Sequence, residues 1–266
     1  LGDVYKRQKY ISTRTIGADH IDLTAAKELG IKVCNSNYAP NGVADYTVML
    51  MLLSLRKYKP ALWRAQVNDY SLAGLQGREL RNLTVGILGT GKIGAAVIKN
   101  LSGFGCRILA SDIRENPSLK GLCTYVDNET LYKECDIISL HMPLLDSTRH
   151  FVNAETIAKM KDGVTIINCA RGELMNIPDM IRGIETQKIG ALALDVFDKE
   201  DGIYHENRRD DILSNRDMAY LRQFPNVIMT QHMAFYTDAA VQSMVFCGIE
   251  GLCDFAKTGH TATELV

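Results

Sequence analysis

Short apolar runs alternate with amphipathic stretches along the middle of the chain, from about residue 83 to residue 230. The runs are apolar on both faces, which is typical of strands buried in a parallel sheet, and the stretches between them have helical periodicity. The predicted strands are 84–88, 107–110, 124–126, 136–140, 164–168, 191–196 and 226–230. The predicted helices are 93–101, 129–133, 154–161 and 178–184. This alternation predicts an α/β fold with a doubly wound parallel sheet.

A further helix is predicted at 43–55, where almost every side is apolar. Such a helix must be covered all round. Two alternatives stay open: it lies in a core between two domains, or it also contacts a second subunit.

Composition limits the class of protein. The 266 residues suffice for one or two domains, and 30 basic against 31 acidic residues give a net charge of -1. This balance offers no electrostatic reason to expect nucleic acid or an anionic membrane as a partner. The apolar run 48–53 is too short to span a bilayer, and we expect no secretory signal. Seven cysteines without CxxC spacing indicate reduced thiols in the cytoplasm and no disulfide framework, zinc site or other metal site.

A glycine-rich turn follows the first predicted strand of the sheet. Gly89, Gly91 and Gly94 fit GxGxxG, and these glycines with Lys92 and Ile93 between them are the predicted cofactor-binding residues of this turn. Asp112 ends the following strand, where an acid that binds ribose hydroxyls is expected. The glycines allow a tight turn and a close approach of the backbone to a pyrophosphate at the helix N-terminus. NAD is favoured over NADP because a carboxylate repels a 2′-phosphate, although Arg114 lies close by.

Polar residues follow the later strands. Because the carboxyl ends of parallel strands meet at one edge, these residues are expected to lie together. They are His141-Met142-Pro143, Cys169-Ala170-Arg171, Asp195, Glu200 and Gln231-His232.

This set suits the reduction of a 2-keto acid by a bound nicotinamide. An arginine binds the carboxylate of the substrate through paired hydrogen bonds, and a histidine donates a proton to the carbonyl oxygen of the substrate. An acidic residue orients that histidine. Each residue also has a simpler interpretation: Arg171 in a solvated turn, Glu200 in an exposed loop, and His141 or His232 as structural histidines. Their common place at the predicted cofactor edge favours the functional interpretation.

Four motifs together resemble the D-2-hydroxyacid dehydrogenase family, and most resemble its NAD-dependent D-lactate dehydrogenases, including the vancomycin-resistance type. They are the glycine loop, Asn168-Cys169-Ala170-Arg171-Gly172, Ala193-Leu194-Asp195-Val196-Phe197 and Gln231-His232-Met233-Ala234-Phe235-Tyr236-Thr237. The resemblance extends from about residue 9 to the C-terminus. The aromatic pair Phe235-Tyr236 and the long insert 202–221 suit the lactate branch, whereas Gln231 stands where the family usually has proline.

The resemblance implies roles for individual residues. Arg171, Glu200 and His232 would be catalytic, and Asp195 would hold the nicotinamide carboxamide. His141, Met142, Pro143, Cys169 and Ala170 would lie along the cofactor. The substrate pocket would be lined by Ile16, Gly17, Tyr38 and Phe235.

The resemblance also implies two domains. The dinucleotide-binding domain would be 39–232, inserted in a smaller flavodoxin-like α/β substrate domain formed by 9–38 and 233–266. That substrate domain is expected to lack its N-terminal part, and residues 1–8 are expected to be a non-native scar. We expect a homodimer.

The leading hypothesis is NADH-dependent reduction of a small 2-keto acid, pyruvate to D-lactate. The alternatives are a family member acting on a longer 2-keto acid, glyoxylate, hydroxypyruvate or a phosphoglycerate-type substrate, and an NAD-sensing binding protein similar to the family's corepressor relatives. An inactive fragment is a third possibility.

Overall fold

The computed structural model describes residues 8–18 and 20–266 and divides into two compact units. Unit 1 is Leu1–Gly42 with Phe235–Val266, and unit 2 is Val43–Ala234. Of the predicted non-native segment 1–8, only Gln8 lies within the described residues.

Unit 2 is built on a seven-stranded sheet in the order β5-β4-β3-β6-β7-β8-β9, with every neighbouring pair parallel. The chain runs outward from β3 to β5 and then returns to place β6 on the other side of β3, so the direction of winding changes between β3 and β6. The predicted doubly wound architecture is therefore confirmed. The strands are β3 (Thr84–Leu88), β4 (Arg107–Ser111), β5 (Thr124–Tyr125), β6 (Ile137–Leu140), β7 (Val164–Asn168), β8 (Ile189–Leu194) and β9 (Val227–Met229).

The strand boundaries differ most from prediction at β8 and β9. Strand β8 begins at Ile189, earlier than expected, because Gly190 has no side chain and packs against Gly163. A Cβ on Gly190 would lie 2.5 Å from the Gly163 carbonyl oxygen. Strand β9 is the last of the sheet and is shorter than predicted, since an edge strand pairs on one side only.

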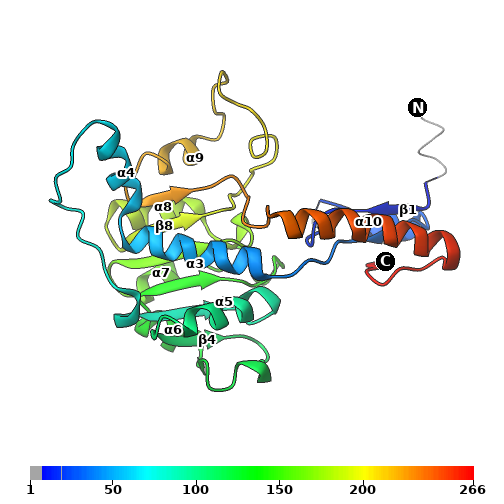
Figure 1. The fold of residues 1–266 in the computed structure, drawn as a ribbon, viewed down its shortest axis with the longest axis horizontal. Helices are drawn as coiled ribbons and strands as arrows, with labels where there is room; N and C mark the ends of the chain where they lie inside the picture. Colours follow the sequence, from blue (N-terminus) through cyan, green and yellow to red (C-terminus); the bar gives the residue numbers. More distant parts are fainter. Residues whose placement is uncertain (1–7, 19) are drawn as a thin grey trace. The chain divides into compact units, whose positions relative to one another are not determined.

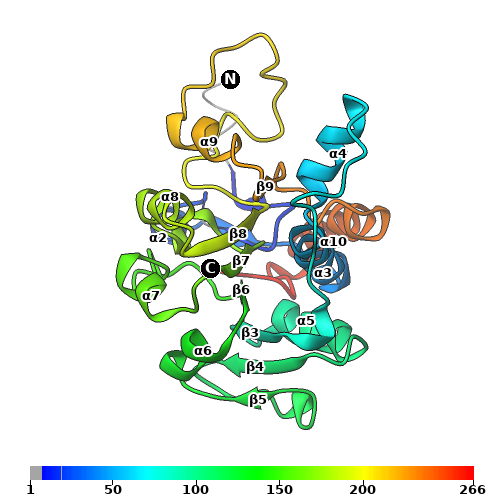
Figure 2. The same ribbon diagram turned by 90° about the vertical axis from the view of Figure 1, so that its left-hand side faces the viewer.

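Helices cover both faces of this sheet (Figure 2). One face carries α6 (Asn128–Glu134), α7 (Ala154–Lys159) and α8 (Ile177–Glu185), and the other carries α5 (Lys92–Ser102) and α3 (Asn41–Leu55). The remaining helices of unit 2 are α4 (Tyr58–Gln66) and α9 (Arg216–Leu221), with short 3-10 turns at η1 (Leu80–Asn82), η2 (Pro117–Leu119) and η3 (Gly172–Leu174).

Helix α7 starts as predicted and ends earlier than predicted. Asn153 caps it with a capping box, in which its side chain accepts from Thr156 N and the Thr156 hydroxyl accepts from Asn153 N. The helix ends at Lys159 because Met160 turns to an extended conformation and is buried.

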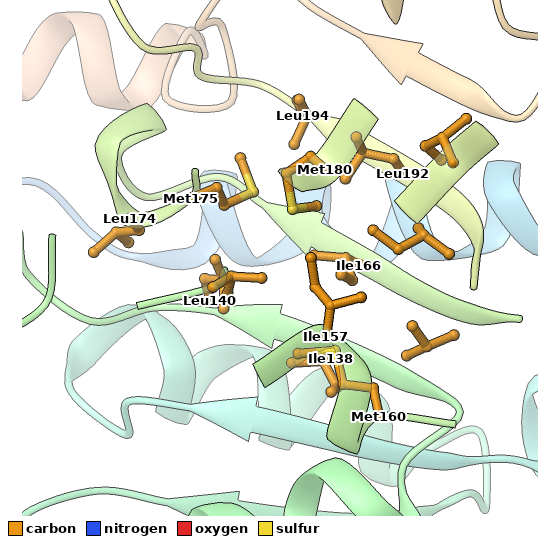
Figure 3. Close-up of a cluster of buried hydrophobic side chains, with 14 of the residues drawn as sticks. Ile138, Leu140, Ile157, Met160, Ile166, Leu174, Met175, Met180, Leu192 and Leu194 are labelled. Carbon is orange, nitrogen blue, oxygen red and sulfur yellow. The ribbon is translucent and has the colours of Figure 1, made fainter. Parts of the chain in front are cut away.

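The core of unit 2 lies between the sheet and the layer formed by α7 and α8 (Figure 3). Its side chains come from the strands and the covering helices, and include Ile138, Leu140, Ile157, Met160, Ile166, Leu174, Met175, Met180, Leu192 and Leu194. Burial of this apolar surface holds the central strands in place, and their carboxyl ends therefore provide a rigid edge.

Unit 1 contains a two-stranded parallel sheet of β1 (Tyr10–Ser12) and β2 (Lys32–Cys34), with α2 (Leu23–Glu28) and α10 (Asp238–Thr258). Figure 1 shows α10 beside β1, and the two are joined by stacking of Tyr10 on Phe255 with ring centroids 4.9 Å apart.

Helix α10 is the one described helix that is long and apolar enough to cross a membrane, with a mean hydropathy of 1.2 over its most apolar window. This helix is distinct from the shorter apolar run 48–53, which lies in α3. Core helices of soluble proteins pass the same test of length and composition. Helix α10 packs on β1, and 17% of its most apolar window is buried.

Candidate functional site at the carboxyl edge of the sheet

The glycine loop joins β3 to α5 and packs against the end of β6. Gly89 has a φ of 94°, and a Cβ on it would lie 2.8 Å from the His141 carbonyl oxygen. A Cβ on Gly94 would lie 2.0 Å from the Gly89 carbonyl oxygen, whereas a Cβ on Gly91 would meet nothing within 4 Å. Two of the glycines therefore allow close packing, and the third faces open space where α5 begins with Lys92 and Ile93.

Asp112 follows β4 and is tied to this loop. Its Oδ2 accepts from the main-chain N of Thr90 at 2.5 Å and from the Thr90 hydroxyl at 3.1 Å, and its Oδ1 accepts from Arg114 N at 3.1 Å. Burial opposes ionisation, but these hydrogen bonds outweigh it and lower the pKa of Asp112. A carboxylate thus lies beside the glycine loop. The Arg114 contact with it is made by main-chain N–H.

His141 follows β6 between the glycine loop and the rest of the edge, and Met142 and Pro143 come after it. Its Nε2 lies 2.9 Å from the hydroxyl of Ser139, a residue with no exposed surface. Burial lowers the pKa of His141 to about 4, so the imidazole is neutral at physiological pH.

The turn after β7 is shaped by the buried Asn168. Its side chain accepts from Ala170 N at 2.9 Å and donates to the Arg171 carbonyl oxygen at 2.8 Å. Arg171 Nη1 donates to the Ala170 carbonyl oxygen at 2.8 Å. Cys169 is buried, which raises the pKa of its thiol to about 12 and keeps it protonated.

Gly172 brings this turn to the segment that follows β8. A Cβ on Gly172 would lie 2.1 Å from Phe197 C and 2.3 Å from Asp198 N, so the two backbones are in direct contact. Glu200 holds the same segment, since its Oε2 accepts from Phe197 N at 2.7 Å. The turn that carries Arg171 and the loop that carries Glu200 therefore both contact the backbone of Phe197.

Glu200 and His232 are in contact although 32 residues separate them. Glu200 Oε1 and His232 Nδ1 form a short hydrogen bond, and both side chains are largely buried. When the carboxylate is ionised it can only accept, so Nδ1 carries the hydrogen. With Nδ1 bound to Glu200, proton transfer by this ring would take place at Nε2.

Asp195 holds the backbone that follows His232. This carboxylate has no exposed surface; its Oδ1 accepts from the Thr230 hydroxyl at 2.6 Å and from Met233 N at 3.0 Å, and its Oδ2 accepts from Ala234 N at 2.8 Å. The three donors give this buried carboxylate the hydrogen bonds that a polar group needs inside a protein. Oδ1 accepts from two donors and Oδ2 from one, so Oδ2 is the oxygen that could accept from a carboxamide. The contact with a carboxamide stays a prediction.

The four residues assigned to the substrate pocket lie in unit 1. Asn35 Nδ2 donates to the Ile16 carbonyl oxygen at 2.7 Å, and the Thr15 hydroxyl donates to that of Gly17 at 2.6 Å. Tyr38 lies in the segment after β2 and Phe235 opens the second segment of the unit. Their contacts with substrate also stay predictions.

Two further residues reach the His232 segment and were not singled out from the sequence. Thr230 was interpreted as the last residue of a strand, and His205 lies in the insert, which has no periodic pattern. The hydroxyl of Thr230 binds Asp195, and Nε2 of His205 lies 3.1 Å from the main-chain oxygen of His232. No signal in the local sequence indicated either contact.

Comparison with known proteins gives the same family. Residues 48–234 match the family described as "D-isomer specific 2-hydroxyacid dehydrogenase, NAD binding domain". An aromatic 2-oxoacid reductase of Clostridium sporogenes is 46% identical over 260 residues, covering 97% of this chain and 78% of the relative. A D-specific alpha-keto acid dehydrogenase of Enterococcus faecalis is 40% identical over 250 residues, covering 94% and 76% of the two chains.

A solved structure agrees with these sequence matches. D-lactate dehydrogenase from Aquifex aeolicus, complexed with NAD and lactic acid, aligns with a TM-score of 0.88 and 33% identity, covering 96% of this chain and 80% of that one. The predicted family and the NAD cofactor are thereby confirmed. The chain belongs to the D-isomer specific 2-hydroxyacid dehydrogenases, which makes it an NAD-dependent enzyme.

Proposed function

We propose that this protein reduces pyruvate to D-lactate with NADH, using Arg171, Glu200 and His232 as its catalytic residues. The observation that carries the proposal is the partly buried hydrogen bond between His232 and Glu200 at the carboxyl edge of a dinucleotide-binding sheet. An imidazole held in this way presents Nε2 for proton transfer at neutral pH.

The glycine loop and Asp112 are the residues that would hold the dinucleotide. Open space at Gly91 and the helix N-terminus that begins at Lys92 suit a pyrophosphate, and the ionised Asp112 suits ribose hydroxyls. When bound, NADH supplies the hydride that reduces the carbonyl carbon.

The side chains at the strand ends would perform the rest of the reaction. The guanidinium of Arg171 binds the substrate carboxylate through two parallel hydrogen bonds. His232 donates a proton from Nε2 to the carbonyl oxygen while Glu200 holds Nδ1–H and stabilises the protonated ring. The neutral His141 adds no charge to this edge.

A second candidate substrate is an aromatic 2-oxo acid. The relative named for that activity is 46% identical, whereas the D-lactate dehydrogenase of Lactobacillus delbrueckii is 40% identical. The two candidates differ only in the substrate side chain, so the proposed roles of Arg171, Glu200 and His232 are the same for both.

The test is NADH oxidation, followed by absorbance, with pyruvate, longer aliphatic 2-oxo acids and phenylpyruvate. We expect turnover with a 2-oxo acid, a D-configured product by chiral chromatography, and the highest kcat/KM with pyruvate. A higher kcat/KM with phenylpyruvate than with pyruvate would contradict pyruvate as the substrate and favour an aromatic 2-oxo acid.

The variant His232→Ala separates catalysis from cofactor binding. We expect kcat to fall by about 10²-fold or more, the usual range for general acid catalysis, with NADH affinity changed little. Retained turnover would contradict the role of His232. Absence of turnover with every 2-oxo acid in the wild type, with NADH still bound, would favour a binding protein over an enzyme.

We also propose a homodimer in the cytoplasm. The segment from α4 to residue 72 exposes large apolar side chains, including Trp63 at 64%, Tyr70 at 76% and Leu72 at 83%. Exposed apolar surface of this kind supports a protein interface, and seven free cysteines suit a reducing compartment. Sedimentation equilibrium showing a monomer at micromolar concentration would contradict the dimer.

A further inference from the structure

A turn of six residues after β8 reaches His232 from two sides. At its start, Glu200 contacts Nδ1 of His232 through its side chain. Its main-chain oxygen accepts from Ile203 N and Tyr204 N, both at 3.0 Å, which closes the turn. At its end, Nε2 of His205 lies 3.1 Å from the main-chain oxygen of His232. The turn therefore touches both the ring and the backbone of the same histidine.

The direction of the hydrogen bond between His205 Nε2 and the main-chain oxygen of His232 follows from the chemistry of the acceptor. A carbonyl oxygen cannot donate, so Nε2 of His205 must carry the hydrogen. The neutral ring can adopt this tautomer and the protonated ring also has a hydrogen at Nε2, so the hydrogen bond exists in both states. The ring centroids of His205 and His232 are 6.1 Å apart, which places the two imidazoles side by side.

The backbone at both ends of this hydrogen bond is left-handed. His232 has a φ of 53° and His205 a φ of 64°, a region that residues with a Cβ adopt only where their surroundings hold them. On the far side of His232, Asp195 holds the N–H groups of Met233 and Ala234. On the near side, His205 donates a hydrogen bond to the main-chain carbonyl oxygen of His232.

We propose that His205 is a positioning residue for the acid/base histidine. By donating from Nε2 to the main-chain carbonyl of His232, it maintains the left-handed backbone that directs the imidazole toward Glu200. This inference rests on the proposed function, in which His232 delivers the proton. It also gives the insert 202–221 a role in catalysis without any contact between His205 and the substrate.

The test compares two substitutions at His205 with a control in the same loop. His205→Phe keeps a ring of similar size and removes the donor. His205→Gln keeps an N–H near the position of Nε2. Glu206→Gln changes the next residue of the loop, which is exposed.

We expect His205→Phe to lower kcat by about tenfold, the order expected for one lost hydrogen bond at an aligned site, with KM and NADH affinity nearly unchanged. His205→Gln should restore kcat to within about twofold of wild type, and Glu206→Gln should leave it unchanged. Wild-type kcat in the Phe variant, or an equal loss in the Phe and Gln variants, would overturn the positioning role.

A readout independent of turnover separates this inference from the proposed function. The proton on His232 Nδ1, assigned by its loss in His232→Ala, should give a downfield NMR signal that shifts or broadens in His205→Phe and persists in His205→Gln. An unchanged signal in the Phe variant would overturn the inference even if the enzyme reduces pyruvate. If the wild type reduces no 2-oxo acid, the proposed function fails, and the signal still decides whether His205 holds His232.

Discussion

At the scale of single residues, the glycine loop shows that identical residues can be required for different reasons. Gly94 has no room for a Cβ, because that atom would lie 2.0 Å from a backbone oxygen. Gly91 has room, since nothing lies within 4 Å, and its φ of −63° is one that any residue adopts. Gly94 therefore serves packing, whereas the open space at Gly91 suits the approach of a ligand.

This difference predicts opposite behaviour for two alanine variants. Gly94→Ala should lower the free energy of unfolding by about 2 kcal/mol, because the neighbouring backbone must shift. Gly91→Ala should change it by less than about 1 kcal/mol but weaken NADH binding by about tenfold or more, because the methyl group would occupy the approach to the pyrophosphate. Urea unfolding and NADH fluorescence titration measure the two effects, and equal effects on both quantities in both variants would contradict this division.

At the scale of elements, the ends of the central strands carry the site, and β6 places a half-buried histidine there. Burial lowers the pKa of His141 from 6.5 to about 4. Between these two values the unfolded chain binds a proton that the folded chain excludes, so the free energy of unfolding decreases as the pH falls through this window. At pH values about one unit or more above 6.5 both states are neutral at this ring and the contribution is constant.

We therefore expect acid sensitivity that depends on His141. Lowering the pH from about 7 to about 5 should reduce the free energy of unfolding by about 2 kcal/mol more in the wild type than in His141→Gln. Glutamine is chosen because it retains a polar group toward Ser139 without titrating. Urea unfolding at the two pH values measures the difference, and parallel losses in both proteins would show that the ring does not titrate on unfolding.

At the scale of the whole molecule, the chain forms two units, and the glycine loop, Asp112 and the His232–Glu200 pair all belong to unit 2. The proposed NADH site depends on the folded arrangement of β3, β4 and β6. A ligand that binds only the folded state stabilises it by mass action.

NADH should accordingly raise the thermal stability of this protein. At a concentration about a hundredfold above its Kd, the expected stabilisation is about 2.7 kcal/mol. Differential scanning calorimetry should show a higher Tm for the wild type and for His232→Ala, whose glycine loop is intact. Gly91→Ala should gain much less, and an equal gain in that variant would place the dinucleotide elsewhere.

Much of the fold followed from local pattern. The strands 84–88 and 164–168 are found where they were predicted, because both are almost entirely apolar and no other element suits such short buried runs. The boundary at β8 was missed, because the close approach of Gly190 to Gly163 joins residues distant along the chain. Helix α10 was not predicted as an element.

The sequence by itself determined the alternation of strands and helices from β3 to β8, the glycine turn, and the polar residues that end each strand. These features depend on periodicity and on residue type over a few neighbouring positions. Only the tertiary structure decided that Gly172 packs on Phe197, that Asp195 holds Met233 and Ala234, and that His205 holds His232. These contacts join segments about 25 to 39 residues apart through loops, and a loop's path is set by packing and hydrogen bonds that no local period encodes.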